Sequence, residues 1–424
     1  MSIASSLKST GIAEVMVIMK TAPAARARAS VATPRNISRH FVRSALSQDN
    51  ALLEQLRQRD ALAASNAATA GPTALNLGSA SVPESKVRYY PNLGIALGVV
   101  DRAGLAELKK EALVAKVIDA PQLRLIKPVL AAAAKPDSGY TWGLKALNID
   151  ALHAQGWRGK GILVGHLDTG VDATHVALKG AVQAYAEFDA LGSQVAGASP
   201  RDSGTHGTHT AGTIAGRPVK GVHFGVAPEA TLASAMVIEG GNVLARILGG
   251  MNWAVGQQVR ILSMSLGLIG TKDTFLLLTR LLRARGILPV FAVGNEGAGV
   301  SRYPGNYAEA LSVGASGPDD SVADFSGSQQ FLRAKDPLVP DLVAPGVDII
   351  SCVPDGKYME MSGTSMATPH IAGLAALLMQ ARPDKSIDEI ESAMFRSCTL
   401  RPLMTASRAN HGLPDAVLAL SLLS

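Results

Sequence analysis

Apolar residues follow two different patterns in the two parts of this 424-residue chain. In the larger, C-terminal part, short apolar runs alternate with segments in which apolar residues recur at helical spacing. The runs cover residues 161–170, 231–238, 259–267, 287–297 and 310–316, and the helical segments cover 207–216, 243–256 and 273–285. Strands that alternate with helices in this way are typical of a parallel sheet covered by helices on both faces.

The N-terminal part has a shorter pattern with fewer elements. In chain order these are a strand at 12–20, a helix at 38–63, a polar loop at 64–86, a strand pair at 87–100, an amphipathic helix at 103–117 and an extended piece at 124–129. The small and turn-forming residues of the loop are typical of a segment without fixed structure. The order β-α-β-β-α-β predicts a small ferredoxin-like α+β domain.

Residues 130–139 separate these two parts and are rich in alanine and proline, which is typical of a linker. The sequence therefore predicts an α+β domain at 1–129 and a linker at 130–139. The remaining residues, 140–424, are predicted to form a three-layer α/β/α domain with a mostly parallel sheet.

Charge and composition narrow the classes of protein. Residues 1–136 hold 18 Lys and Arg against 9 Asp and Glu, whereas residues 137–424 hold 22 against 25, so we expect the two parts to attract each other. The basic residues are scattered and aromatic residues are only 4% of the chain, which argues against nucleic-acid binding. The longest apolar stretches are too short for a membrane-spanning helix. Separately, we expect the protein to be a monomer.

The cysteines and the N-terminal residues are the sequence features that bear on the cellular compartment of the protein. Cys352 and Cys398 fit no metal-binding spacing, and either a disulfide or two buried thiols would suit them. The first 20 residues lack the apolar core of a Sec signal peptide. From this we expect a cytoplasmic protein or one exported by a non-classical route.

Four polar residues stand where the predicted strands end or the helices begin. Asp168 and Asn295 each end a strand, and His206 and Ser365 each begin a helix. In α/β sheets, functional groups gather at the carboxyl ends of the strands. There an aspartate can orient an imidazole, the imidazole can take the proton of a serine, and an amide can stabilise the resulting oxyanion.

Each of these residues also has a simpler interpretation. A lone aspartate at a strand end is usually a turn residue, and a lone serine before a helix is usually a cap. For Ser365, capping leaves its small neighbours and Pro369 unexplained. Pro369 lacks an N–H, so the Ser365 carbonyl loses its helical hydrogen bond and the backbone there is less constrained.

The motifs around these residues resemble a known family. LDTGVDATH, HGTHTAGTIAG, SMSLG, AVGNEG and GTSMATPHIAG occur in this order, as in the subtilisin-like serine peptidases, and the resemblance covers residues 140–424. It implies a subtilisin-like fold in which Asp168 orients His206, His206 is the general base, Ser365 is the nucleophile and Asn295 donates to the oxyanion. The backbone N–H of Ser365 would be the second donor.

The same resemblance implies further roles. The substrate would bind as an added strand along residues of the SLG motif, the GGN segment and the AVGNEG motif, namely Ser265, Leu266, Gly267, Gly240, Gly241, Asn242 and Gly294. His209 and His370 would be structural. His166 stands two residues before Asp168, where the family usually has an aliphatic residue, and we expect it to pack or hydrogen-bond locally.

Residues 1–129 resemble the inhibitory propeptide of the family. The resemblance implies a zymogen in which residues around 124–134 lie across the active site and self-cleavage falls in or near VLAAAAKP. Leu130 and the alanines at 131–134 indicate a preference for small or medium apolar residues at the cleaved position. The partners would then be polypeptide substrates and the chain's own propeptide.

Calcium, which is common in this family, is not expected at the usual tight site. Its acidic and asparagine ligands correspond here to Ala177 and Val219, which lack side-chain oxygens, so we predict no metal and no cofactor.

Three alternatives remain open from the sequence. A dedicated processing peptidase with a narrow substrate range would share every motif. An inactive peptide-binding relative would have a damaged set of catalytic residues, and here all four are present. A nucleotide-binding protein would need a glycine-rich phosphate loop after the first strand, where this chain has HLDTGVDATH.

Overall fold

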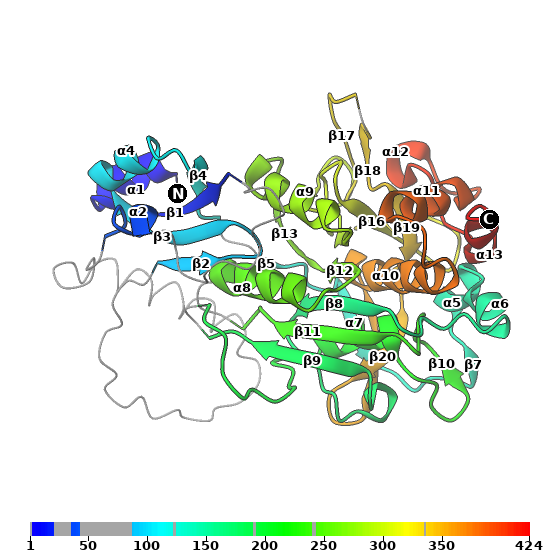
Figure 1. Cartoon of the computed structure of the whole chain (residues 1–424). Coiled ribbons are helices and arrows are strands. Elements are labelled where there is room, and N and C mark those ends of the chain that lie inside the picture. Colours follow the sequence, from blue (N-terminus) through cyan, green and yellow to red (C-terminus); the bar gives the residue numbers. More distant parts are fainter. Residues whose placement is uncertain are drawn as a thin grey trace. The chain divides into compact units, whose positions relative to one another are not determined.

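A computed structural model describes residues 2–20, 35–42, 87–121, 124–189, 192–239, 243–334 and 336–424. Contacts divide the chain into two units (Figure 1). The first comprises residues 1–122, 190–192 and 240–252, and the second comprises 123–189, 193–239 and 253–424.

The second unit is built on a seven-stranded sheet in which every neighbouring pair is parallel. In spatial order its strands are β19 (Leu342–Pro345), β16 (Leu311–Ser316), β14 (Leu288–Ala292), β12 (Ile261–Met264), β8 (Leu163–Asp168), β11 (Thr231–Met236) and β9 (Val182–Glu187). This arrangement confirms the predicted α/β class and the five predicted strands. The two edge strands, β9 and β19, are not among the predicted apolar runs.

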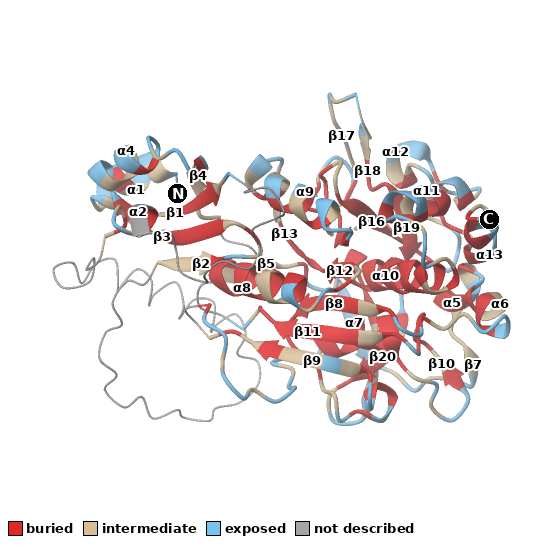
Figure 2. Cartoon of the chain, in the orientation of Figure 1, coloured by how far each residue is buried: buried red, intermediate tan, exposed pale blue. Residues whose placement is uncertain are grey.

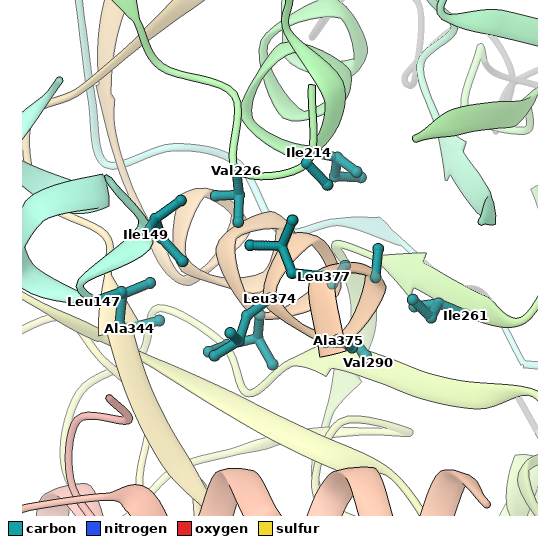
Figure 3. Packing of buried hydrophobic residues seen from close by; sticks show 14 of the residues in the cluster. Leu147, Ile149, Ile214, Val226, Ile261, Val290, Ala344, Leu374, Ala375 and Leu377 are labelled. Carbon is teal, nitrogen blue, oxygen red and sulfur yellow. The ribbon is translucent and has the colours of Figure 1, made fainter. Parts of the chain in front are cut away.

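Two helices pack on one face of this sheet. Helix α7 (His206–Ala215) contacts β8 and β11, and the long helix α10 (Thr364–Ala381) contacts β12, β14, β16 and β19. Figure 3 shows Leu374 and Leu377 of α10 within the resulting core, near Ile261 and Val290 of the sheet.

Residues that alternate with the core positions along the strands are also buried. Leu262 and Phe291 are fully enclosed, and β8, β11 and β12 are coloured almost entirely as buried in Figure 2. Because alternate side chains point to opposite faces, both faces of the central strands are covered. This explains why these strands read as continuous apolar runs in the sequence.

Two further predicted helices are present, as α8 (Val243–Gly256) and α9 (Leu276–Ala284), the latter preceded by the 3-10 turn η3 (Asp273–Phe275). The short strands of the second unit are β5 (Arg124–Leu125), β6 (Leu130–Ala133), β7 (Gly139–Tyr140), β10 (Val222–His223), β13 (Leu266–Ile269), β15 (Arg302–Tyr303), β17 (Gln329–Gln330), β18 (Leu338–Val339), β20 (Ile349–Val353) and β21 (Lys357–Ser362). Its remaining helices are α5 (Trp142–Ala146), α6 (Ile149–Ala154), η2 (Val176–Leu178), α11 (Ile387–Ser397), α12 (Ala406–Ala409) and α13 (Ala416–Ser421).

The first unit contains a four-stranded antiparallel sheet of order β2-β3-β1-β4. Its described elements are α1 (Ile3–Ser9), β1 (Ile12–Met19), α2 (Arg35–Ser38), β2 (Arg88–Tyr90), β3 (Ile95–Asp101), α4 (Arg102–Leu108) and β4 (Val114–Asp119). Val15, Val17, Phe41 and Leu108 form its small core. The start of α8 belongs to this unit, where Tyr90 donates a hydrogen bond to the Ala245 carbonyl at 3.1 Å.

Two predictions for this unit are wrong. The helix predicted at 103–117 ends at Leu108, and Val114–Asp119 forms the fourth strand instead, paired with β1. The backbone N–H and C=O groups of this strand form hydrogen bonds with β1, and this pairing outweighs the helical spacing of the local sequence. The extended piece at 124–129 is therefore not the fourth strand, and its first residues, β5, pair with β13 of the second unit.

Other predictions for the N-terminal part are not tested. The predicted helix at 38–63 lies outside the described residues except for 38–42, and the loop at 64–86 lies entirely outside them. The ferredoxin-like assignment therefore stays a prediction.

Two general features of the described residues bear on the chemistry. Cys352 and Cys398 are free thiols, and Cys352 is buried. None of the helices in the described ranges combines the length and the apolar content that crossing a membrane requires.

Candidate active site

Asp168 and His206 meet at the carboxyl edge of the sheet. Asp168 is the last residue of β8, His206 is the first residue of α7, and His206 Nδ1 lies 2.7 Å from Asp168 Oδ1. A Cβ atom on Gly207 would lie 2.1 Å from the Gly170 carbonyl oxygen. Glycine at 207 therefore lets the start of α7 approach the turn after β8 closely enough for this hydrogen bond.

Ser365 is the second residue of α10, and the N-cap position belongs to Gly363. The capping interpretation of Ser365 is therefore wrong, because its hydroxyl donates to the Ile126 carbonyl at 2.7 Å and accepts nothing from the helix. Pro369 has no N–H to donate to the Ser365 carbonyl, which instead accepts a hydrogen bond from the Ser265 hydroxyl at 3.3 Å.

Asn295 follows β14 and is held by the start of α10. Its Oδ1 accepts hydrogen bonds from the Thr364 backbone N–H at 2.9 Å and from the Thr364 hydroxyl at 2.8 Å. These two donors fix the orientation of the amide, so its NH₂ group points away from them. Asn295 Nδ2 donates to the Lys127 carbonyl at 2.9 Å.

A segment of the chain itself lies along these residues. Arg124 and Leu125 form β5, which pairs antiparallel with Gly267 and Leu266 of β13, and the Ile126 N–H donates to the Ser265 carbonyl at 3.0 Å. Downstream, β6 pairs antiparallel with β21, where Leu130 lies opposite Ser362. The segment thus crosses the site as an added strand, with the carbonyls of Ile126 and Lys127 over Ser365 and Asn295.

The structure joins some of the predicted site residues directly and not others. Asp168 bonds to His206, while Ser365 bonds to Ile126. His206 Nε2 is buried and has no hydrogen-bond partner within the described part of the chain. The hydroxyl of Ser365 therefore gives its proton to the crossing segment and not to the imidazole.

The charge state of the Asp168 carboxyl follows from its surroundings. Burial by itself would raise its pKa, but the adjacent His206 and the Thr169 N–H at 2.7 Å more than offset this, and the pKa is lowered from its ordinary value. The carboxylate is therefore ionised at neutral pH and can stabilise a positive charge on His206.

The predicted substrate-binding residues fall into two groups. Ser265, Leu266 and Gly267 pair with the crossing segment as described above. Gly294, at the end of β14, has a φ of +117° and faces the side chains of Glu296 and Arg302. The other group, Gly240, Gly241 and Asn242, lies outside the described residues.

Sequence reasoning missed several residues that shape the site. Thr364 holds Asn295, and Arg302 donates to Glu296 at 2.9 Å and to the Gly267 carbonyl at 3.2 Å. Thr364 immediately precedes Ser365 in the GTS motif, so its place in the motif is the available signal. Arg302 carries no such signal, because only the fold brings it beside Gly267.

His209 and His370 are buried and bonded to backbone. His209 Nε2 donates to the Ile349 carbonyl at 2.9 Å, and His370 Nδ1 donates to the Met366 carbonyl at 2.8 Å. Burial lowers the pKa of His209 to about 3 and that of His370 to about 4. These contacts support a structural role for both residues.

The low pKa of His209 predicts a loss of stability in acid. An unfolded histidine has a pKa of about 6.5, so between pH 6.5 and about 3 the unfolded chain binds a proton that the folded chain does not. Stability is therefore retained above pH 6.5 and decreases as the pH falls through this window. From pH 7 to 5 we expect His209 alone to reduce the free energy of unfolding by about 2 kcal/mol.

Urea unfolding of the chain at pH 7 and at pH 5 measures this effect. The His209→Gln variant keeps an N–H donor for Ile349 but cannot titrate. It should lose less stability than its parent between pH 7 and 5, and an equal loss would show that His209 is not responsible.

The structure describes Ala177, one of the two positions considered for the family's tight calcium site, and the neighbouring Arg217. No group of three or more His, Cys, Asp or Glu side chains suited to a metal ion occurs among the described residues. Ala177 is buried in η2, and its carbonyl accepts the Arg217 N–H at 2.7 Å. The Arg217 guanidinium donates hydrogen bonds to the carbonyls of Ala215 and Gly180. The positive charge near these carbonyl oxygens is therefore that of a side chain.

Comparison with known proteins agrees with this geometry. A parallel α/β sheet with an aspartate–histidine pair, a helix-borne serine and an amide at its carboxyl edge is the arrangement of a serine hydrolase. The subtilase family model matches residues 159–415. The chain belongs to the subtilase family, the family of subtilisin-like serine endopeptidases.

Individual relatives align over the same region. M-protease of Shouchella clausii is 36% identical over 61% of this chain and 64% of its own length. Subtilisin Savinase of Lederbergia lenta is 36% identical over 61% of this chain and 91% of its own length. The major intracellular serine protease of Bacillus subtilis is 39% identical over 62% of this chain and 82% of its own length. The chain thus spans just under two thirds of M-protease and most of the other two.

Proposed function

We propose that this chain is a serine endopeptidase in which Asp168, His206 and Ser365 form the catalytic triad. The observation that carries the proposal is that an extended segment of the chain, which contains Ile126 and Lys127, is bound at the site. The Ser365 hydroxyl and the Asn295 amide donate to consecutive carbonyls of the same extended segment, and Asp168 and His206 form their own hydrogen-bonded pair. Asn295 thus holds the Lys127 carbonyl as an oxyanion donor would hold the carbonyl of a bound peptide, whereas the Ser365 proton goes to the preceding carbonyl.

Each residue then has a defined part in the reaction. His206 Nε2 takes the Ser365 proton as the oxygen attacks the substrate carbonyl, and Asp168 stabilises the imidazolium that forms. Asn295 Nδ2 and the Ser365 backbone N–H bind the developing oxyanion, the latter at the start of α10, where the helix dipole favours negative charge. His206 then protonates the leaving amine, and water hydrolyses the acyl-enzyme. No step requires a cofactor.

The crossing segment fits the role of an internal inhibitor. It pairs with β13 as a substrate would, yet it binds the Ser365 proton at the Ile126 carbonyl and leaves His206 Nε2 without a partner among the described residues. A serine whose proton points away from the base is not activated. We propose that the chain is a zymogen and that Ser365 turns toward His206 when this segment leaves.

A time course of the purified full-length chain tests this proposal. The wild type should shorten to a stable form whose new N-terminus lies within residues 130–139, the predicted processing region. It should then react with a fluorophosphonate probe, which labels activated serines. The Ser365→Ala chain should do neither.

Two results would contradict the proposal. A wild-type chain that stays at full length and unlabelled would show that it does not process itself. A Ser365→Ala chain that shortens at the same rate would show that another protease makes the cut.

A further inference from the structure

The histidine at position 166 lies beneath the Asp168–His206 pair. His166 and Asp168 are two residues apart in β8, so their side chains point to the same face of the sheet, the face that α7 covers. His166 is only 1% exposed. An aliphatic side chain would fill this position without any polar group to satisfy, so a buried imidazole here calls for an explanation.

Both ring nitrogens of His166 have side-chain partners. Nδ1 lies 2.9 Å from the hydroxyl of Ser234, its neighbour in β11, and Nε2 lies 2.8 Å from the hydroxyl of Thr210 in α7. The Thr210 hydroxyl in turn lies 3.2 Å from Asp168 Oδ2. Three buried polar side chains thus form a continuous hydrogen-bonded chain that ends on the carboxylate.

The donors and acceptors in this hydrogen-bonded series can be assigned from the Asp168 carboxylate at its end. An ionised carboxylate only accepts hydrogen bonds, so the Thr210 hydroxyl must donate to Asp168 Oδ2. That uses its single proton, and Thr210 must therefore accept from His166 Nε2–H. His166 Nδ1 then carries no proton and accepts from Ser234. All three donors point toward Asp168.

Backbone carbonyls of α7 compete for the Thr210 proton. The carbonyl oxygens of His206 and Gly207 lie 3.2 and 3.1 Å from the hydroxyl. Carbonyls inside a helix already accept a backbone N–H, whereas a buried carboxylate is charged and binds a donor more strongly. The carboxylate is therefore the preferred acceptor.

The two carboxylate oxygens then have separate partners. Oδ1 accepts from His206 Nδ1 and from the Thr169 N–H, and Oδ2 accepts from Thr210. A carboxylate held at both oxygens cannot rotate about the Cβ–Cγ bond without losing a charge-assisted hydrogen bond. Rotation is the motion that would break the alignment of Oδ1 with His206.

We propose that Ser234, His166 and Thr210 form a relay that positions Asp168 for catalysis, in addition to the three residues of the triad. None of them touches the substrate, so they are positioning residues. The inference rests on the proposed function, because it takes Asp168 as the residue that orients His206.

The relay also sets how much charge Asp168 presents to His206. Hydrogen bonds at Oδ2 spread the negative charge of the carboxylate away from Oδ1. Removing them leaves more charge facing the imidazole, so the hydrogen bond between His206 Nδ1 and Asp168 Oδ1 should change. The charged and titratable groups that face His166 are Asp168, Asp202 and His206, while β11 and β12 contribute Ser234 and Ser263 beside it. Burial lowers the pKa of His166, which keeps it neutral in this chain.

The Thr210→Val variant tests the relay, because valine keeps nearly the same shape and removes only the hydroxyl. The matched control is Thr213→Val, one turn further along α7, where the hydroxyl bonds to the His209 carbonyl at 3.0 Å. We expect Thr210→Val to lower kcat about tenfold with KM unchanged, the loss expected for one hydrogen bond to a charged group. Thr213→Val should leave both constants unchanged.

A second measurement does not depend on activity. In the Ser365→Ala chain with ¹⁵N-labelled histidines, NMR reports the hydrogen bond from His206 Nδ1 to Asp168 Oδ1 and the tautomer of His166. Thr210→Val should shift the resonance of the His206 Nδ1 proton and Ser234→Ala should shift it less, whereas Thr213→Val should leave it unchanged. His166 should carry its proton on Nε2.

The outcomes separate the relay from the proposed function. If Thr210→Val shifts the His206 Nδ1 proton resonance no more than Thr213→Val does, or if His166 carries its proton on Nδ1, the relay is wrong. If this resonance shifts as expected but the wild type has no peptidase activity, the relay exists and the proposed function fails. Should Thr210→Val not fold, Ser234→Ala and the tautomer of His166 still decide the question.

Discussion

Replacing Ser365 with alanine is expected to lower kcat for peptide hydrolysis by about 10⁶, the size of the loss when subtilisin itself lacks its serine. Without Oγ there is no nucleophile, and His206 has no proton to take. The remaining rate comes from Asn295, the backbone N–H groups and substrate binding, which still stabilise an oxyanion formed by water attack.

This comparison needs a design that removes the crossing segment from both proteins. Under the proposed zymogen mechanism, a Ser365→Ala chain cannot process itself and keeps the segment at the site, where the segment alone would block turnover. A recognition sequence for an unrelated protease, placed within residues 134–138, lets both chains be cut identically. Initial rates on a chromogenic peptide, corrected for the number of sites that bind a peptide inhibitor, then give kcat.

A neighbouring serine provides the matched control. The Ser265 hydroxyl donates to the Ser365 carbonyl at 3.3 Å and lies beside the same segment, but it does not attack. Ser265→Ala should keep most of the activity. A Ser365→Ala enzyme that retains more than about a hundredth of the wild-type kcat would show that another group is the nucleophile.

The sequence predicted the sheet of the second unit because its strands are buried on both faces. Such strands are continuous apolar runs, and the five central ones are recognisable without any structure. The edge strands are different. Val182–Glu187 is half-exposed and mixes polar with apolar residues, and Leu342–Pro345 is only four residues long, so neither forms a clear run.

Pairing partners were the main source of error in the first unit. Residues 103–117 have helical spacing through Leu105 and Leu108, but Val114–Asp119 gains more by pairing with β1. Such non-local pairing is not visible in a local pattern. For the same reason, the sequence predicted that residues around 124–134 cross the site but not that Ile126 and Lys127 would be the ones facing Ser365 and Asn295.

The site was predictable to the extent that its residues belong to motifs. Asp168, His206, Asn295 and Ser365 each lie in a distinctive motif, and their place at the sheet edge predicted that they lie close together, which the structure shows directly for Asp168 and His206. No sequence feature of this kind distinguishes Thr210 and Ser234, because a threonine in a helix or a serine in a strand is common. Only the distances to His166 give them a role.

Replacing Asp168 with asparagine is expected to lower kcat by up to about 10⁴, the loss in another Ser-His-Asp enzyme, where the same change also gives the wrong histidine tautomer. The structure indicates how the amide would sit. The Thr169 N–H donates to Oδ1 at 2.7 Å and requires an oxygen there, so the NH₂ group would occupy the Oδ2 position. The amide oxygen would still accept from His206, and the main loss would be the negative charge that stabilises the imidazolium.

The matched control for this change is Asp202→Asn. Asp202 accepts hydrogen bonds from the Thr169 hydroxyl at 2.7 Å and from the Thr208 N–H at 2.7 Å, but it does not contact His206. This variant should lose stability more than kcat. Similar losses of kcat in both variants would mean that general disruption of the turn after β8, and not the charge of Asp168, explains the effect.

The pH dependence of kcat/KM separates the roles of the two ends of the Asp168 carboxylate. Under the proposed mechanism, the acidic limb reports the protonation of the general base in the free enzyme. Asp168→Asn removes an adjacent anion and should move the limb to lower pH, whereas Thr210→Val concentrates charge on Oδ1 and should move it to higher pH. Opposite shifts from two substitutions around one carboxylate are expected only if the carboxylate is charged and if Thr210 donates to it. Shifts in the same direction would contradict this account of the site.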